Sequence, residues 1–290
     1  MRKNMKFNSV EDTYRLNNGV KIPIIGFGTW QTPAGKVATD AVLAALDAGF
    51  THIDTAEMYG NEKSIGQAVK ASGIARSDLF ITSKLDNQAH TYELATQALD
   101  RSLSDLQTDY LDLFLIHWPN PKAFRDHDWE KHLQETWRAL EDAYTAGKVK
   151  AIGVSNFKPK HFEVLKKTQK IQPMVDQIRI CPGDVDRLTI DYCQQHDILL
   201  EAYSPFGTGQ IFANETLKAL AQKKKRSVAQ LCLRWSLQHG YLPLPKSVHP
   251  ARIKENTEVF DFELTESEMQ QIDALKGVAG FATDPDTADF

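Results

Sequence analysis

Cysteine is scarce in this chain, and long apolar runs are absent from it. The 290 residues include three cysteines, Cys181, Cys193 and Cys232, which form no Cys-x-x-Cys pair and leave one thiol over if two were bridged. This pattern indicates reduced thiols and gives no support for a zinc site. No stretch is apolar for long enough to span a bilayer, and no apolar segment follows the basic residues at the start. We therefore expect a cytoplasmic protein without membrane contact.

An excess of charge of one sign is also missing. The 34 basic and 38 acidic side chains leave a net charge of -4 at pH 7, so no overall field attracts nucleic acid or an anionic membrane. One basic run, residues 223–226, ends a predicted helix, where positive charge complements the helix dipole. We expect no nucleic-acid partner, and a monomer is the default expectation.

Motifs of three common enzyme classes are absent. Gly26 and Gly28 begin a dinucleotide-binding fingerprint, but its third glycine would fall at Gln31. Neither Ser155 nor Ser204 lies in a Gly-x-Ser-x-Gly elbow, and no Walker A lysine follows a glycine-rich loop. These absences argue against a Rossmann domain, a serine hydrolase and a P-loop NTPase.

Short apolar runs recur along the chain, and amphipathic helical patterns such as Leu133, Trp137 and Leu140 separate them. Each run is short and apolar enough for a strand buried on both faces, and alternation with helices implies parallel pairing. Eight such strands are what a (β/α)8 TIM barrel requires. The predicted strands are Ile24–Gly28, His52–Thr55, Leu79–Ser83, Leu111–Ile116, Ala151–Val154, Met174–Ile178, Leu199–Ala202 and Leu242–Leu244.

Additions are expected at both ends of this barrel. Asn17-Asn18-Gly19 separates two strand-like segments, Thr13–Leu16 and Val20–Ile22, and supplies the positive φ angles of a tight hairpin turn. We also expect a loop insertion at Asn120–Lys131 and a non-helical tail from Gly277 to Phe290. No linker rich in Pro, Gly or Ser interrupts the repeat. Residues 1–290 therefore predict a single barrel domain with an N-terminal β-hairpin and a C-terminal loop.

Polar residues lie at the ends of the predicted strands, where such barrels place their active sites. Asp54, Lys84 and His117 end or follow consecutive strands, and Tyr59 lies in the loop after the first of them. A phenol with a pKa of about 10 donates poorly at neutral pH. An ammonium from Lys84, held by Asp54, would favour the phenolate and lower that pKa. With His117 as a second donor, Tyr59 is suited to protonating a carbonyl oxygen as hydride reaches its carbon, which predicts carbonyl reduction.

A metal site is an alternative interpretation of the same strand ends. His52 and Asp54 alternate on one predicted strand, and His117 follows another, so they could begin the site of a metal-dependent hydrolase. No second carboxylate or histidine cluster completes the shell. We expect no metal.

Separated segments carry a set of motifs in a fixed order. They are Gly26-Phe27-Gly28-Thr29-Trp30, His52-Ile53-Asp54-Thr55-Ala56 with Tyr59, Ile116-His117-Trp118-Pro119, Gly153-Val154-Ser155-Asn156-Phe157, Ala202-Tyr203-Ser204-Pro205 and Leu244-Pro245-Lys246-Ser247-Val248, followed by Arg252, Glu255 and Asn256. Over nearly the whole chain this set resembles the aldo-keto reductase superfamily, and it is most similar to the bacterial branch that includes the 2,5-diketo-gluconate reductases. The resemblance implies a tetrad of Asp54, Tyr59, Lys84 and His117, with Tyr59 as general acid and NADPH as hydride donor.

The resemblance also implies the contacts of the NADPH nicotinamide. Ser155, Asn156 and Gln177 would bind its carboxamide through hydroxyl and amide groups, and Tyr203 would stack on its ring. Asp176, Arg179 and Cys181 replace the Asn, Glu and His that are frequent around this glutamine. The further contacts implied near the strand ends are Gly28, Thr29, Trp30, Ser204, Pro205 and Val248.

The other end of the cofactor is matched by the last motif. Lys246, Ser247 and Arg252 correspond to the adenosine 2′-phosphate site, where a point charge, a hydroxyl and a guanidinium suit a dianion. The match favours NADPH over NADH. Glu255 and Asn256 would contact the adenine.

The substrate pocket departs from the family pattern at one wall. Trp30 and Trp118 match aromatic walls beside Tyr59 and His117, but Asp86 stands where many relatives carry tryptophan. This exchange predicts a more polar pocket. The resembling family uses its C-terminal tail for specificity, so the tail around Phe281 is expected to close over the pocket.

The sequence thus predicts a cytoplasmic, NADPH-dependent oxidoreductase that reduces aldehydes or ketones to alcohols. An alternative is a cofactor-binding, redox-sensing protein that keeps the barrel and turns over slowly. Retention of the whole tetrad argues against that alternative.

Overall fold

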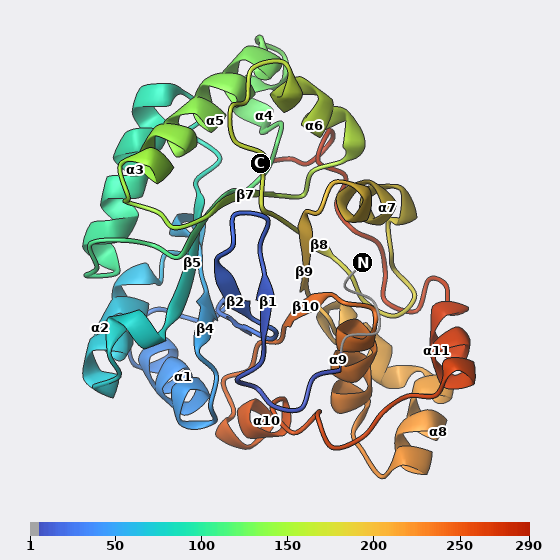
Figure 1. Cartoon of the computed structure of the whole chain (residues 1–290). Helices are drawn as coiled ribbons and strands as arrows, with labels where there is room; N and C mark the ends of the chain where they lie inside the picture. The colour runs from blue at the N-terminus through green and yellow to red at the C-terminus, as the bar shows by residue number, and fades with distance from the viewer. Residues whose placement is uncertain (1–5) are drawn as a thin grey trace.

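Eight parallel strands form the central sheet, as the apolar runs predict (Figure 1). The computed structural model describes residues 6–290. Each strand of this sheet pairs with the next one along the chain, and every predicted run contains or overlaps an observed strand. The strands are β3 (Phe27–Gly28), β4 (His52–Asp54), β5 (Phe80–Leu85), β6 (Leu113–Ile116), β7 (Ile152–Ser155), β8 (Val175–Arg179), β9 (Leu199–Tyr203) and β10 (Leu242–Leu244).

Backbone hydrogen bonds close the sheet into a barrel. The Gly26 amide donates to the Pro243 carbonyl at 3.1 Å, and the Gly28 amide donates to the Pro245 carbonyl at 3.0 Å. A Cβ at Gly26 would lie 2.6 Å from the Leu244 side chain of β10 and 2.5 Å from the His52 ring of β4, so glycine leaves the room that this close approach needs. The result is the (β/α)8 TIM barrel predicted from the sequence.

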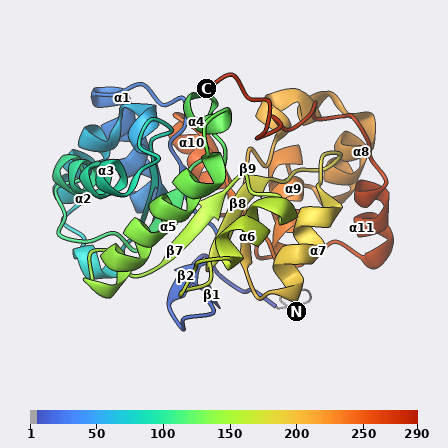
Figure 2. The same ribbon diagram turned by 90° about the horizontal axis from the view of Figure 1, so that it is seen from above.

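Helices surround the barrel in both views of the ribbon (Figures 1 and 2). The predicted amphipathic face of α5 is confirmed, because Leu133, Trp137 and Leu140 are all buried. The helices are α1 (Lys36–Asp47), α2 (Glu62–Ser72), α3 (Tyr92–Asp105), α4 (Lys122–Arg125), α5 (Trp129–Thr145), α6 (Pro159–Lys166), α7 (Arg187–Gln195), α8 (Glu215–Lys224), α9 (Val228–Gln238), α10 (Pro250–Glu255) and α11 (Glu266–Asp273), with 3-10 segments η1 (Glu57–Tyr59), η2 (Arg76–Asp78) and η3 (Gly207–Ala213).

The predicted N-terminal hairpin is present as β1 (Thr13–Arg15) and β2 (Lys21–Pro23). It lies at the opposite end of the barrel from the C-terminal segment (Figure 2). The turn is tight, as expected: the Gly19 amide donates to the Leu16 carbonyl at 2.8 Å, and Gly19, with φ of 90°, adopts the left-handed region. The Asn18 side chain also accepts the Val20 amide at 3.1 Å, which stabilises this turn.

The expected loop insertion at Asn120–Lys131 is partly wrong. The segment contains the short helix α4, and α5 already begins at Trp129. Local contacts order this stretch: the Arg125 side chain donates to the Asn120 carbonyl, and the Phe124 and His132 rings meet at 4.8 Å. These aromatic contacts are not visible as a periodic pattern in the sequence.

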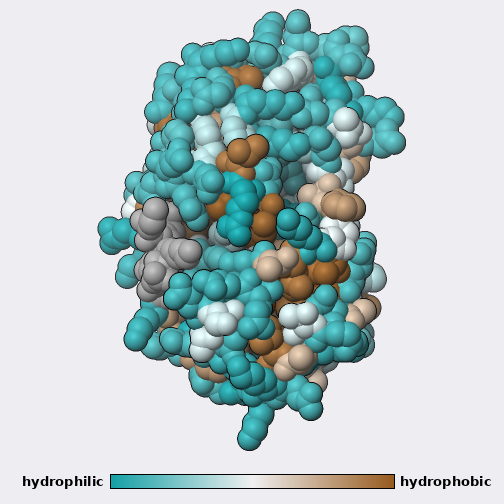
Figure 3. Space-filling view, turned by 90° about the vertical axis from the view of Figure 1, so that its right-hand side faces the viewer, coloured by the Kyte–Doolittle hydropathy of each residue, from teal (hydrophilic) through white to brown (hydrophobic). Residues whose placement is uncertain are grey.

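Much of the surface is polar. On the face seen in Figure 3, hydrophilic residues dominate and apolar residues form separate patches. Among residues 6–290, no helix combines the length and the apolar composition that crossing a membrane requires.

Candidate active site

The carboxyl ends of the parallel strands carry the residues that the sequence singled out. Asp54 ends β4, Lys84 is next to last in β5, and His117 directly follows β6. Ser155 ends β7 and Tyr203 ends β9. Because all strands run in the same direction, these side chains gather at one end of the barrel.

Lys84 occupies the centre of this group and is completely buried. Its Nζ lies 2.8 Å from both carboxylate oxygens of Asp54 and donates to the Thr55 carbonyl at 2.8 Å. The Tyr59 hydroxyl lies 3.4 Å from the same nitrogen. A buried ion pair persists only where further hydrogen bonds satisfy its donors, and the Thr55 carbonyl supplies one here.

Tyr59 reaches the group from η1 in the loop after β4. Gly60, with φ of 65°, ends this 3-10 turn in a left-handed conformation that glycine adopts freely. The Tyr59 ring meets the His117 ring edge-on, with centroids 5.7 Å apart. The structure therefore brings all members of the predicted tetrad together.

Burial changes the acidity of these groups. It raises the pKa of the Tyr59 phenol, while the Lys84 ammonium opposes that rise and the Asp54 carboxylate adds to it. The expected net lowering of the Tyr59 pKa is thus wrong, although the effect of Lys84 has the expected sign. Burial alone would lower the pKa of Lys84, but Asp54 and Tyr59 raise it overall, so the ammonium stays charged. Burial and Lys84 hold the pKa of His117 well below its usual value, which leaves a neutral imidazole.

A second layer of polar side chains lies against the Lys84–Asp54 pair. The Gln177 amide nitrogen donates to Asp54 at 2.8 Å and to Glu201 at 2.7 Å. Glu201 is completely buried on β9, and its other oxygen lies 3.9 Å from His52 Nε2. This layer links β4, β8 and β9 inside the barrel.

The residues expected at the nicotinamide are joined to one another and to His117. Ser155 donates to the Gln177 carbonyl at 2.7 Å, and the Asn156 amide donates to the His117 carbonyl at 3.0 Å. The Tyr203 hydroxyl donates to the Asn156 side-chain oxygen at 2.8 Å. Asn156 has a φ of 61°, a strained region for residues other than glycine, and such strain clusters at functional sites.

The residues expected at the 2′-phosphate lie in the loop after β10 and in α10. Lys246 donates to the Gln31 carbonyl at 3.1 Å, Ser247 is buried, and Arg252 is exposed. In the part of the chain that the structure describes, neither cation forms an ion pair with a carboxylate. This set of a hydroxyl and two uncompensated cations fits a phosphate dianion.

The remaining expected cofactor contacts are dispersed around the same end. Thr29 is buried and donates to the Asp54 carbonyl at 2.9 Å, so its hydroxyl fastens two neighbouring strand ends. Glu255 ends α10 and Asn256 follows it. The others occupy the strand ends and the loops that follow β3, β9 and β10: Gly28, Trp30, Ser204, Pro205 and Val248.

The expected pocket walls differ in exposure. Trp30 is 46% exposed, Asp86 is partly buried just after β5, and Trp118 is buried. Phe290 packs edge-on against Trp118, with ring centroids 4.8 Å apart. Phe281 is 85% exposed, so Phe290 makes the contact with the wall that was expected from the tail around Phe281.

The C-terminal tail, residues 277–290, is held by ion pairs. Lys160 lies 2.5 Å from Asp286, whose other oxygen contacts His161 at 3.1 Å. Lys158 pairs with Asp284 at 3.0 Å. These partners come from the loop after β7 and from α6, so the tail lies over the end of the barrel that carries the tetrad.

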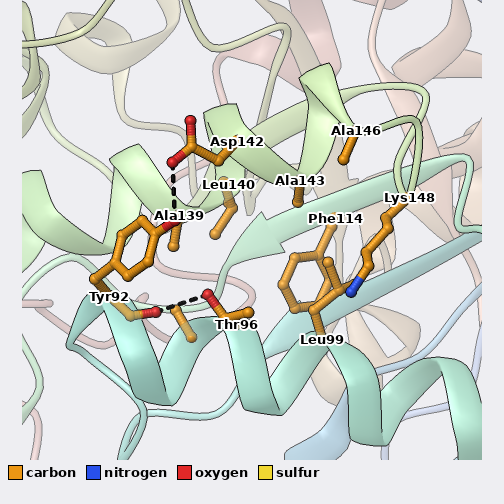
Figure 4. A pocket seen from close by; sticks show the side chains of 11 residues that line it. Tyr92, Thr96, Leu99, Phe114, Ala139, Leu140, Asp142, Ala143, Ala146 and Lys148 are labelled. Atoms are coloured by element: carbon orange, nitrogen blue, oxygen red, sulfur yellow. Dashed lines mark hydrogen bonds between the residues drawn. The ribbon is translucent and has the colours of Figure 1, made fainter.

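Two further observations concern a possible metal site and a hollow outside the tetrad. Within residues 6–290, no three His, Cys, Asp or Glu side chains are arranged to hold a metal ion. A hollow of about 150 Å³ lies between α3 and α5, away from the tetrad (Figure 4). It is lined mainly by apolar side chains, and Tyr92 donates to Asp142 at its edge.

Comparison with known proteins defines the class. The Aldo/keto reductase family model matches residues 24–276. Glyoxal reductase of Bacillus subtilis (strain 168) is 46% identical over 278 residues, covering 96% of this chain and 98% of the relative. The 9,11-endoperoxide prostaglandin H2 reductase of Trypanosoma cruzi (strain CL Brener) is 43% identical, covering 93% and 94%. The crystal structure of a Bombyx mori aldo-keto reductase in complex with NADP superposes with a TM-score of 0.84 at 34% identity, covering 92% and 93%.

The chain belongs to the aldo/keto reductase family. It is therefore an oxidoreductase of this type.

Sequence reasoning missed two residues of the site. Glu201 interrupts the apolar run of β9, and a charged residue inside a strand that is buried on both faces was a signal that could have found it. Phe290 gave no signal, because its contact with Trp118 depends on the path of a non-helical tail.

Proposed function

We propose that this protein is an NADPH-dependent reductase of aldehydes or ketones in which Tyr59 is the general acid. The observation that carries the proposal is the position of the Lys84 ammonium, bonded to both oxygens of Asp54 and 3.4 Å from the Tyr59 hydroxyl. A cation held at this place stabilises the phenolate that forms as the proton leaves. Membership of the aldo/keto reductase family supports the same chemistry.

NADPH, when bound, supplies the hydride. Tyr59 gives its proton to the carbonyl oxygen, and the neutral His117 imidazole offers a second hydrogen bond to that oxygen. Asp54 keeps Lys84 charged and in place. Ser155, Asn156, Gln177 and Tyr203 hold the nicotinamide.

We infer that the substrates are small, polar carbonyl compounds, such as dicarbonyls and keto sugars. Asp86 contributes a carboxylate where an aromatic wall would make the pocket apolar, and a relative of 46% identity is a glyoxal reductase. Keto sugars would connect the chain to the 2,5-diketo-gluconate reductase branch. The three buried free thiols support a cytoplasmic setting.

The decisive experiment follows NADPH oxidation with a panel of aldehydes, α-dicarbonyls, keto sugars and bulky ketones for the wild type and Tyr59→Phe. We expect kcat to fall on the order of 10²–10⁴-fold in the variant with its circular dichroism spectrum unchanged, because the phenolic proton is lost. Tyr110→Phe, at a partly buried tyrosine whose hydroxyl donates to the Arg76 carbonyl rather than to the tetrad, is the matched control and should keep wild-type turnover. Turnover near the wild-type level in Tyr59→Phe would refute the acid assignment.

The cofactor assignment has its own test. Lys246→Ala and Arg252→Ala should raise the KM for NADPH far more than that for NADH, because only NADPH carries the 2′-phosphate. Equal effects on both cofactors would refute the phosphate site.

A further inference from the structure

Glu201 is a buried carboxyl group for which the mechanism above has no use. Its side chain points into the barrel, where one oxygen accepts the Gln177 amide at 2.7 Å. The other oxygen has no hydrogen-bond partner among the described residues and lies 3.9 Å from His52 Nε2. An ionised carboxylate with so few donors would lower the free energy of unfolding in an interior without water. Either the group is protonated or its burial has a role.

The contacts of Gln177 connect Glu201 to the tetrad. Both acceptors of the Gln177 nitrogen are carboxyl groups, Asp54 at 2.8 Å and Glu201 at 2.7 Å. Two acceptors use both hydrogens of the amide and fix which way it is turned. Glu201 thereby holds the nitrogen of Gln177 against the carboxylate that holds Lys84.

The other groups around Glu201 limit what can titrate there. His52 and Asp54 face it from β4, and Lys84 contributes from β5. Burial, with a contribution from Lys84, lowers the pKa of His52 to about 3, so this imidazole is neutral. β10 places Leu242 beside Glu201, which adds no charge. Burial and the Asp54 carboxylate raise the pKa of Glu201 to about 8, so it carries a proton at neutral pH.

We propose that Glu201 is a positioning residue for carbonyl reduction, which orients Gln177 against Asp54 and, by releasing one proton, changes the negative charge that Lys84 and Tyr59 experience. The proposal rests on the proposed function, because it concerns the rate at which Tyr59 donates. With Glu201 neutral, Asp54 is the one carboxylate within hydrogen-bonding distance of Lys84 among residues 6–290. Once Glu201 ionises, a second negative charge opposes formation of the Tyr59 phenolate and slows proton donation.

Two substitutions separate orientation from titration. Glu201→Gln keeps an oxygen acceptor for Gln177 and cannot ionise, whereas Glu201→Leu removes the acceptor as well. The matched control is Glu62→Gln, because Glu62 is another buried carboxyl whose pKa burial raises, to about 7, and it bonds to Ser83 and Ser102 rather than to the tetrad.

The first measurement is kcat at saturating NADPH and carbonyl substrate from pH 6 to pH 9.5. Wild-type kcat should fall on the order of three- to tenfold as pH rises through about 8, because the site gains one negative charge. Glu201→Gln should keep wild-type kcat at pH 6.5 within about twofold and lose the fall near pH 8. Glu201→Leu should lower kcat at every pH with little change in the carbonyl KM. Glu62→Gln should retain the fall.

The second measurement does not need turnover. Between about pH 4.5 and pH 8 native Glu201 keeps a proton that the unfolded chain has released, so its burial lowers stability progressively as pH rises. The Tm of Glu201→Gln minus that of the wild type should therefore grow from pH 5 to pH 8 and then level off.

Three results would count against these assignments. A fall near pH 8 that persists in Glu201→Gln, with a Tm difference independent of pH, overturns the titrating role of Glu201. Wild-type kcat in Glu201→Leu overturns the orienting role. Wild-type protein that oxidises no NADPH with any carbonyl refutes the proposed function, and with it a role for Glu201 in reduction, whatever the Tm series shows.

Discussion

The carboxyl groups inside the protein and those of the C-terminal tail differ both in their partners and in their solvation. Glu62 and Glu201 are buried, and the loss of water raises the pKa of each, to about 7 and about 8. In the tail, partial burial of Asp286 acts in the same direction, but Lys160 and His161 outweigh it and bring its pKa to about 2. Ionisation therefore lowers the stability of the native state at Glu62 and Glu201 and raises it at Asp286.

The difference in solvation separates an ion pair that can act on the reacting groups from one that holds a segment in place. Lys84 and Asp54 are almost fully removed from water, so their charges act strongly on the neighbouring Tyr59. The Lys160–Asp286 pair is 59% and 22% exposed, and water and salt screen it. The interior pair can change the acidity of a phenol, whereas the pair between Lys160 and Asp286 fastens the tail to α6.

The largest expected effect comes from breaking the interior pair. Lys84→Met leaves Asp54 buried without its cation, which should lower the free energy of unfolding by about 3–5 kcal/mol. Loss of the ammonium beside Tyr59 should also lower kcat by at least about 100-fold. Urea unfolding and NADPH oxidation measure the two effects. Lys160→Met, which breaks the ion pair between α6 and the tail, is the control, and an equal loss of stability in both variants would contradict the difference between the two pairs.

A smaller effect is expected from Glu62, which lies outside the tetrad. Its pKa of about 7 is above that of an unfolded glutamate, so the native state holds the proton longer and stability falls as pH rises from about 4.5 to about 7. Relative to Glu62→Gln, the wild type should lose roughly 2–3 kcal/mol over this range and no more above it. Urea unfolding at several pH values checks this. A difference independent of pH would contradict a protonated Glu62.

The smallest effect should come from the tail. The lowered pKa of Asp286 stabilises the native state above about pH 4, and this contribution is lost as pH falls through about 2. Because Asp286 and Lys160 are partly solvated, Asp286→Asn should cost less than about 1 kcal/mol at pH 7. The cost should shrink between pH 4 and pH 3 in thermal unfolding. If the stability loss caused by Asp286→Asn grew on acidification, the lowered pKa of Asp286 would be contradicted.

Strand positions and the tetrad could be predicted because their signals are local. Each strand is a short apolar run, and Asp54, Lys84 and His117 stand at fixed places relative to those runs. A parallel barrel then converts sequence position into spatial proximity without further information. Tyr59 could be placed near them because its loop is only five residues beyond Asp54.

What could not be predicted depends on burial and on long-range contacts. The direction of the Tyr59 pKa depends on how far desolvation outweighs Lys84, and a sequence does not contain that quantity. The α4 helix and the Phe290 contact arise from aromatic packing between segments that have no common period. The roles of the tetrad and of the cofactor contacts stay predictions until the variants are measured.

Closure of the barrel through Gly26 and Pro243 has a consequence for refolding. The bond between Asp54 and Gln177 spans 123 positions, and the seam bond between Gly26 and Pro243 spans 217. Contacts of such separation form slowly, because a long loop must lose its entropy first. A fragment that ends just after β6, at His117, contains Asp54, Lys84 and His117 but lacks Gln177 and the seam. We therefore expect turnover to recover last in refolding, after the helices have regained their circular dichroism.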